Sequence, residues 1–285
     1  MARIVGSIGC THVPAIGGAI ARGLQGDAYW KPFFDGFPPV RTWLDQVRPD
    51  VAVMFYNDHG LNFFLNNLPT FAVGAAPEYN SEDEGWGIPT VGSFRGHQGL
   101  SWHIIEQLVA DEFDPATCQE MVVDHACTLP LKLLWPGDEG SVPVSIVPIA
   151  INTVQFPIPS PRRCYRLGQS VGRALESYAE DLKVLVIGTG GLSHQLEGPR
   201  AGFINRQFDS ECLEKLVSDP EYLTRYSALG LVQLAGTQGV EVMAWLAARA
   251  TMSGRVTQVH CSYHIPISNT AAGLQVLAHQ SPAAA

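Results

Sequence analysis

Continuous apolar runs alternate with helical patterns along this chain. Five short runs rich in β-branched and other apolar residues predict buried strands at Arg3–Gly9, Asp50–Tyr56, Val144–Ile151, Leu182–Gly188 and Val256–Tyr263. Because the hydrophobicity of these runs is continuous rather than alternating, we expect a sheet covered on both faces, with substantial parallel pairing.

The segments between these runs carry apolar residues at helical spacing. They predict helices at Leu100–Asp111, Gln207–Val217 and Gly239–Ala250, and a further helix that starts at Pro161 behind Ser160 as its N-cap. The pattern is typical of the α/β class, an α/β/α sandwich around a mostly parallel or mixed central sheet. We expect residues 1–280 to form one domain.

Two segments lack such periodicity. Ala75–Phe94 is rich in glycine, proline and acidic residues, and it predicts a long surface loop. Ser281–Ala285 predicts a frayed tail.

The composition narrows the class of protein. Hydrophobic residues make up 46% and charged residues 16% of the chain, a globular balance, and the net charge of −9 argues against a nucleic-acid partner. The six cysteines form no CxxC pair, which is typical of reduced thiols inside the cell. No apolar stretch approaches the length of a membrane span. We therefore expect a soluble cytoplasmic protein.

Two histidines follow predicted strands directly. His59 lies in the polar cluster Asn57-Asp58-His59-Gly60, and His12 follows the first apolar run. Open α/β sheets place their ligands at the carboxyl ends of strands, so both histidines are candidates for a site. The cluster is equally compatible with an ordinary turn, because asparagine, aspartate and glycine favour turns.

Glu241 is the only charged residue in the stretch Val240–Leu246. On a helix it would share a face with apolar side chains, and a buried carboxylate needs a cation, a hydrogen-bond network or a proton. Alternatively, it lies exposed in the first turn of the helix. Combined with His12 and His59 it forms a donor set that suits Fe(II) with open positions for substrate and dioxygen, although zinc could also fill it.

A glycine-rich turn follows the strand predicted to end at Gly188. The spacing fails as a dinucleotide motif, because Ser193 stands where the third glycine is needed. The turn instead presents His194, which could take and return a proton near a metal-bound phenol, serve as a fourth metal ligand or be structural.

Two further segments offer polar groups. His125, next to Asp124, could be a second proton-transfer group, a donor that stabilises oxygen or a loop residue. Ser268 and Asn269 could hold a substrate carboxylate or cap a helix that begins near Ala271.

Together these segments resemble the class III extradiol ring-cleaving dioxygenases, the family of the catalytic β subunits of protocatechuate 4,5-dioxygenases and their gallate-cleaving relatives. The resemblance runs in family order across nearly the whole chain. It rests on the stretches Thr11–Ala15, Tyr56–His59, Asp83–Gly87, Asp124-His125, Gly188–Gln195, Gly198–Gly202, Gly239–Glu241 and Ser268–Thr270.

The resemblance assigns roles to these positions. It implies Fe(II) bound by His12, His59 and Glu241, with His194 as the catalytic acid/base and Ser268 at the substrate carboxylate. Asn57, His125 and Asn269 are carried over as residues near the metal or the substrate, His125 as a second catalytic candidate.

The implied reaction is extradiol cleavage of a carboxylated catechol, with both atoms of O2 inserted. Protocatechuate is the expected substrate, with gallate and 3-O-methylgallate as alternatives. The resemblance also implies a small helical α subunit or a fused equivalent, and a higher oligomer. Two rival functions remain: a non-catalytic metal-binding relative and a zinc hydrolase.

Overall fold

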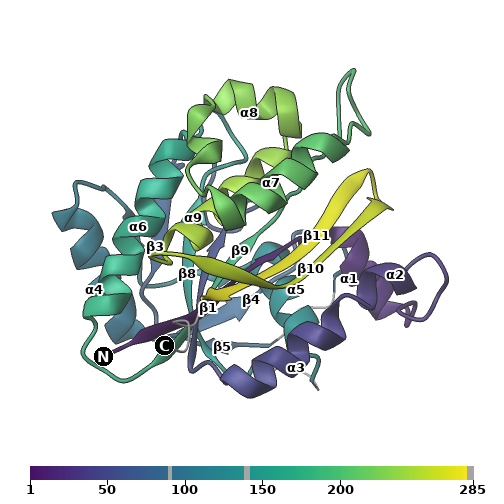
Figure 1. Cartoon of the computed structure of the whole chain (residues 1–285). Coiled ribbons are helices and arrows are strands. Elements are labelled where there is room, and N and C mark those ends of the chain that lie inside the picture. The colour runs from purple at the N-terminus through teal and green to yellow at the C-terminus, as the bar shows by residue number, and fades with distance from the viewer. Residues whose placement is uncertain (89–91, 138–141, 281–285) are drawn as a thin grey trace.

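A large mixed sheet forms the centre of the computed structural model, which describes residues 1–88, 92–137 and 142–280 (Figure 1). In these ranges the sheet has eight strands in the order β10-β11-β1-β9-β2-β8-β3-β6. The strands are β1 (Arg3–Cys10), β2 (Val51–Tyr56), β3 (Phe71–Gly74), β6 (Ala116–Cys118), β8 (Ser145–Ile151), β9 (Lys183–Thr189), β10 (Val256–Ile267) and β11 (Thr270–His279).

The middle of the sheet is parallel and its flanks are mixed. Strands β1, β9, β2 and β8 pair in parallel, whereas β11 pairs antiparallel with both β1 and β10, and β3 pairs antiparallel with β8. The parallel pairing brings the carboxyl ends of β1, β9 and β2 to one edge of the sheet.

Helices cover both faces of the sheet and bury two apolar cores. One core is packed by α4 (Gln98–Ala110), α6 (Pro161–Ser177), α7 (Arg206–Ser218), α8 (Ala228–Ala235) and α9 (Val242–Ala250). The other is packed by α1 (Pro14–Ala21), α2 (Lys31–Phe34), α3 (Phe37–Val47) and α5 (His125–Leu134). The predicted α/β/α sandwich is confirmed. Among the described residues, no helix combines the length and apolar character needed to cross a bilayer.

The predicted elements agree with the observed ones except at three places. Ser160 caps α6 as expected, accepting a hydrogen bond from the Arg163 amide. The alternative that a helix begins near Ala271 is wrong, because this segment belongs to β11. The helix predicted at Gly239–Ala250 is divided into a short 3-10 turn, η2 (Gly239–Glu241), and α9.

The third difference lies in the segment predicted as a surface loop. It contains β4 (Glu78–Ser81), which pairs with β5 (Phe94–Arg95) and β7 (Val122–Val123) in a small second sheet. Residues 89–91 of this segment, and the predicted tail 281–285, lie outside the described residues.

Helix α9 lies directly on strand β9, and a glycine allows this approach. A Cβ atom at Gly188 would lie 2.4 Å from the Ala244 carbonyl oxygen and 2.6 Å from the Trp245 Cα. Both neighbours are backbone atoms, which a rotamer change cannot move away. The absence of a side chain at Gly188 therefore sets the distance between α9 and the sheet, and with it the position of Glu241 just before α9.

We predict that Gly188→Ala destabilises the protein by about 1–3 kcal/mol, the usual cost of overpacking a well-packed core. Gly26→Ala is the matched control, because an added Cβ there meets nothing within 4 Å. It should change stability by less than about 0.5 kcal/mol, as surface substitutions usually do. Urea unfolding curves of the two variants test this; equal midpoints would contradict the packing role of Gly188.

Candidate functional site

The predicted metal ligands meet at the carboxyl edge of the parallel strands. His12 follows β1, His59 follows β2, and Glu241 is the last residue of η2, where α9 begins. Oε2 of Glu241 lies 3.6 Å from Nε2 of His12, and its Oε1 lies 3.9 Å from Nε2 of His59. The structure thus brings together three side chains from distant parts of the sequence.

The carboxylate of Glu241 is buried among imidazoles. Its residue is 7% exposed, and within the described ranges it forms no ion pair with lysine or arginine. Its oxygens accept hydrogen bonds from the Gly191 amide (3.0 Å) and the Asn57 side-chain amide (3.2 Å). The expectation that Glu241 is buried is confirmed, and the exposed alternative is wrong. The carboxylate does not point into apolar packing as predicted, because polar groups surround it.

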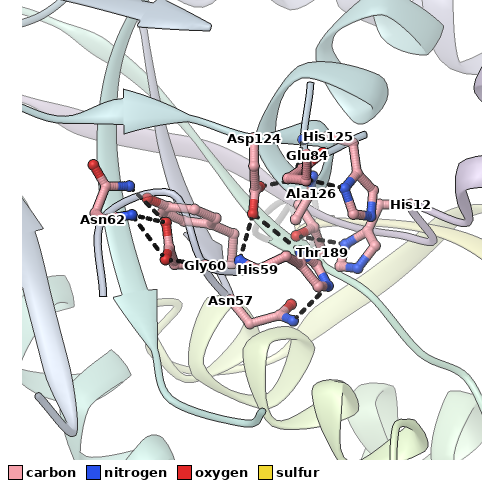
Figure 2. A network of polar contacts seen from close by, with 12 residues as sticks. His12, Asn57, His59, Gly60, Asn62, Glu84, Asp124, His125, Ala126 and Thr189 are labelled. Carbon is pink, nitrogen blue, oxygen red and sulfur yellow. Dashed lines mark hydrogen bonds and ion pairs between the residues drawn. The ribbon is translucent and has the colours of Figure 1, made fainter. Parts of the chain in front are cut away.

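Each histidine of this group has a polar partner on its other ring nitrogen (Figure 2). Nδ1 of His12 lies 3.2 Å from the Thr189 hydroxyl, and Nδ1 of His59 lies 3.0 Å from Oδ2 of Asp124. Metal-binding histidines usually donate this second nitrogen to such a partner, which fixes the tautomer. The Nε2 atoms of both rings therefore face Glu241, where they can serve as ligands.

The ionisation of the group follows from burial and from its mutual charges. Burial lowers the pKa of His12, against the opposing effect of Glu241. Burial also opposes a charge on His59, but Asp124 and Glu241 outweigh it and raise its pKa to about 10. Burial acts against ionised Glu241 as well, yet His12 and His59 hold its pKa well below the usual range. A cation bound between these side chains would compensate the negative charge of Glu241 in place of the proton on His59.

Asn57 lies between His59 and Glu241. Its amide nitrogen is 3.0 Å from Nε2 of His59 and 3.2 Å from Oε1 of Glu241. Its Oδ1 atom is buried and has no partner among the described residues. A buried acceptor of this kind usually has a bound water or ligand as partner, which supports the placement of Asn57 inside a binding site.

His194 reaches the same group from the glycine-rich turn after β9. Its Nδ1 lies 2.9 Å from the Leu192 carbonyl oxygen, and its Nε2 lies 3.9 Å from Oε2 of Glu241. Gly190 has a positive φ of 101°, and a Cβ atom there would lie 2.6 Å from Oε2 of Glu241. The turn thus needs glycine both for its backbone and for the space that Glu241 occupies.

His125 completes the cluster of imidazoles. It is the first residue of α5, and its ring stacks on His59 at a centroid distance of 4.3 Å and contacts His12 edge-on at 5.2 Å. Its Nδ1 lies 2.8 Å from Oε1 of Glu84, which is held by the segment after β4 (Figure 2). His125 is therefore part of the site and not an isolated loop residue.

Ser268 and Asn269 form the tight turn of the β10–β11 hairpin. Both have positive φ values, 49° and 60°, as two-residue hairpin turns require. The residues are exposed, and the next residue, Thr270, forms a bridge with His194. The turn therefore adjoins the segment that carries His194. Within the described ranges, no hydrogen bond or ion pair joins the side chain of Ser268 or Asn269 to the predicted metal ligands.

Three supporting residues were missed in the sequence. Asp124 is the N-cap of α5 and accepts hydrogen bonds from the backbone and side chain of His59, Thr189 contacts His12, and Glu84 contacts His125. An acidic residue before a helix is a recognisable cap, so Asp124 was detectable as such. Nothing in the spacing connects it to His59, and nothing connects Glu84 to His125.

The donor set fits a divalent transition metal. Two imidazoles and one carboxylate that approach one another from three elements leave further coordination positions open. The ring nitrogens of His12, His59 and His125 also lie within 4.8 Å of one another, as do ligand atoms of His59, Glu84, Asp124 and His125. A cation in this region would therefore have more than one set of donors within reach. Glu241 belongs to neither of these two groups and is specific to the predicted set of His12, His59 and Glu241.

Comparison with known proteins supports this chemistry. Residues 6–274 match the model of a family described as the catalytic LigB subunit of aromatic ring-opening dioxygenase. A gallate dioxygenase from Pseudomonas putida is 46% identical over 179 residues, which cover 63% of this chain and 52% of that protein. The chain thus matches about half the length of this relative.

More distant relatives align over most of their length. The 2,3-dihydroxyphenylpropionate/2,3-dihydroxicinnamic acid 1,2-dioxygenases of Rhodococcus jostii and Photorhabdus laumondii are 28% and 27% identical, and cover 76% and 95% of this chain and 80% and 96% of theirs. An uncharacterized protein from Escherichia coli K12 shares the fold, with a TM-score of 0.53 and 11% identity over 95% of this chain and 99% of its own. The chain therefore belongs to the LigB family of catalytic subunits of aromatic ring-opening dioxygenases.

Proposed function

We propose that this chain is the catalytic subunit of an Fe(II)-dependent extradiol dioxygenase that opens the ring of a carboxylated catechol. The observation that carries the proposal is the convergence of His12, His59 and Glu241, whose facing atoms lie 3.6 and 3.9 Å apart. Family membership over residues 6–274 supports the reaction class. The two-histidine, one-carboxylate set supports iron, because it is the donor set of non-haem Fe(II) oxygenases.

When bound, iron would join the catechol and dioxygen in one coordination sphere and let electrons pass between them. The chain itself supplies geometry and proton transfer. Since Nδ1 of His194 is bound to the Leu192 carbonyl, its Nε2 is the atom that can accept the phenolic proton and return it later. The side-chain amide of Asn57 lies within hydrogen-bonding distance of Nε2 of His59 and of Oε1 of Glu241, so it orients two of the three ligands.

The substrate class follows from the relatives and from the hairpin turn. The relatives named above act, by their names, on gallate and on 2,3-dihydroxyphenylpropionate, both of which combine adjacent ring hydroxyls with a carboxylate. Gallate is supported by the highest identity among them, and protocatechuate, which lacks one hydroxyl of gallate, is the alternative. The backbone groups of Ser268 and Asn269, the Ser268 hydroxyl and the Asn269 side-chain amide are the proposed carboxylate site. His125 is the proposed second proton-transfer group.

A partner that closes the site is part of the proposal. The segments after β2 and β8 carry exposed apolar side chains, with Leu65 83%, Phe64 57% and Phe156 47% exposed. Exposed apolar groups of this size near one edge of a sheet are typical of an interaction surface. A small helical subunit, or a segment fused to the chain, would cover them and exclude water from the reaction.

Oxygen uptake tests the function directly. The metal-free protein is reconstituted anaerobically with Fe(II) or Zn(II) and given gallate, protocatechuate or 3-O-methylgallate, with and without a candidate small subunit. We expect oxygen uptake and a ring-opened product with the Fe(II)-loaded protein and not with the Zn(II)-loaded protein. No oxygen uptake with Fe(II) on any of the three substrates, with or without the small subunit, would overturn the proposal.

We predict that His12→Ala, His59→Ala and Glu241→Ala each lose bound iron and activity together, because each removes one ligand from a three-ligand site. His103→Ala is the control: this imidazole lies on α4, with its Nε2 2.9 Å from the Ser177 hydroxyl, and it is not one of the proposed ligands. It should retain iron and activity. Metal analysis after desalting measures the outcome, and stoichiometric iron in all three ligand variants would refute the site.

We predict that His194→Phe keeps its iron but turns over roughly 10²–10⁴-fold more slowly, the usual contribution of general acid–base catalysis. The reason is that His194 is the proposed acid/base and not one of the three proposed ligands, so the substitution removes proton transfer and leaves the donor set in place. Single-turnover rates at saturating substrate measure the loss. A rate close to that of the unmodified protein, at equal iron content, would remove His194 from the mechanism.

A further inference from the structure

Asp209 is a buried carboxylate outside the proposed metal and substrate groups. It lies in the first turn of α7 and has no exposed surface. Within the described ranges it forms no ion pair with lysine or arginine. Burial raises its pKa, while hydrogen bonds from Ser193 and Tyr263 act in the opposite direction. A carboxylate in such a position is costly unless specific donors compensate it.

Three donors converge on this carboxylate. The Ser193 amide donates to Oδ1 at 2.8 Å, and the hydroxyls of Ser193 and Tyr263 donate to Oδ2 at 2.7 Å each. The Asn205 amide donates to the Ser193 hydroxyl oxygen at 2.8 Å. Because that oxygen accepts from Asn205, its own hydrogen is directed toward Asp209. The carboxylate therefore fixes both the backbone and the side chain of Ser193.

Ser193 directly precedes His194, so its anchoring fixes the segment that carries the acid/base candidate. The segment is also tied on its other sides: the Ser193 carbonyl accepts from the Ala271 amide at 3.1 Å, and the His194 amide donates to the Ala235 carbonyl at 2.8 Å. These bonds connect the segment to β11 and to the end of α8. Asp209 adds the connection to α7 and, through Tyr263, to β10.

Tyr263 belongs to the same hairpin as Ser268 and Asn269. It lies on β10 and is paired with Gly273 of β11, while the tight turn lies further along the hairpin. One carboxylate thus contacts the residue beside His194 and a residue of the hairpin that carries the proposed carboxylate site. Asp209 thus joins the proton-transfer half and the substrate-binding half of the proposed site through side chains, in addition to the backbone bridge between His194 and Thr270.

We propose that Asp209 is a positioning residue that holds the His194 segment and the β10–β11 hairpin at a fixed spacing, so that a substrate bound at the hairpin presents its phenolic proton to His194. The catalytic part, the presentation of the phenolic proton to His194, rests on the proposed function. The structural part, the fixed spacing of the two segments, applies to the metal-free chain as well. A displacement of about 1 Å at a reacting group can cost on the order of 10²-fold in rate, so a tie of this kind has a measurable effect.

Hydrogen exchange of the metal-free protein tests the connection that Asp209 makes between Ser193 and Tyr263, called the tie below. Tyr263→Phe removes one donor from Asp209 and leaves the ring in place, and Asp209→Asn removes the charge at nearly constant shape. Tyr222→Phe is the matched control, because the Tyr222 hydroxyl donates to a carboxylate of the same helix, Glu211, at 2.9 Å. We expect exchange of the Gly190–Gln195 amides to accelerate at least threefold in the first two variants and to stay unchanged in the control.

Kinetics of the iron-loaded protein test the consequence. At unchanged iron content, Tyr263→Phe should lower kcat roughly tenfold and Asp209→Asn roughly 10²-fold, while Tyr222→Phe retains the kcat of the unmodified protein. KM for the substrate should rise in the first two variants, since the hairpin moves with the tie.

The outcomes separate this inference from the proposed function. Exchange rates in Tyr263→Phe and Asp209→Asn equal to those of Tyr222→Phe would overturn the tie. Faster exchange with unchanged kcat and KM would overturn the positioning role. An unmodified protein that shows no ring cleavage would refute the proposed function, whereas the exchange experiment would still report on the tie.

Discussion

The buried carboxylate of Glu241 is the constraint on which the rest of this structure depends. It lies at the start of α9 with three imidazoles of other segments facing it, and without lysine or arginine as a partner in the described part of the chain. Such a charge is costly to bury unless a cation or several hydrogen bonds compensate it. Helix α9 can bring it there only because Gly188 lets the helix lie against β9 and Gly190 leaves room for its oxygens.

Each imidazole around this carboxylate has a hydrogen-bond partner at its Nδ1 atom. Nδ1 of His12 contacts Thr189, and Nδ1 of His59 contacts Asp124. In the same way, Nδ1 of His125 contacts Glu84, and Nδ1 of His194 contacts the Leu192 carbonyl. The Nε2 atoms are therefore left to the interior of the site. Fixing one nitrogen of each ring selects a tautomer and a direction at once, which is what metal binding and proton transfer both require. The arrangement explains why so many polar residues are buried at this edge of the sheet.

The main elements and the central residues could be predicted from the sequence because their causes are local. Continuous apolar runs give buried strands, a serine before a proline gives the cap of α6, and a lone glutamate in an apolar helix requires a partner. The remainder depends on contacts between distant residues. Asp124 and His59 are separated by 65 positions, and Asp209 and Ser193 by 16, and no periodicity connects either pair. The β10–β11 hairpin was missed at Ala271, since an apolar run there fits a helix and a strand equally well.

The most direct measurement is a crystal structure of the protein loaded anaerobically with Fe(II), with anomalous scattering recorded at the iron edge. The account predicts one iron peak within about 2.0–2.3 Å of Nε2 of His12, Nε2 of His59 and an oxygen of Glu241, the usual range for such ligands. A peak bound instead by His125, Glu84 and Asp124, with Glu241 outside its coordination sphere, would contradict it.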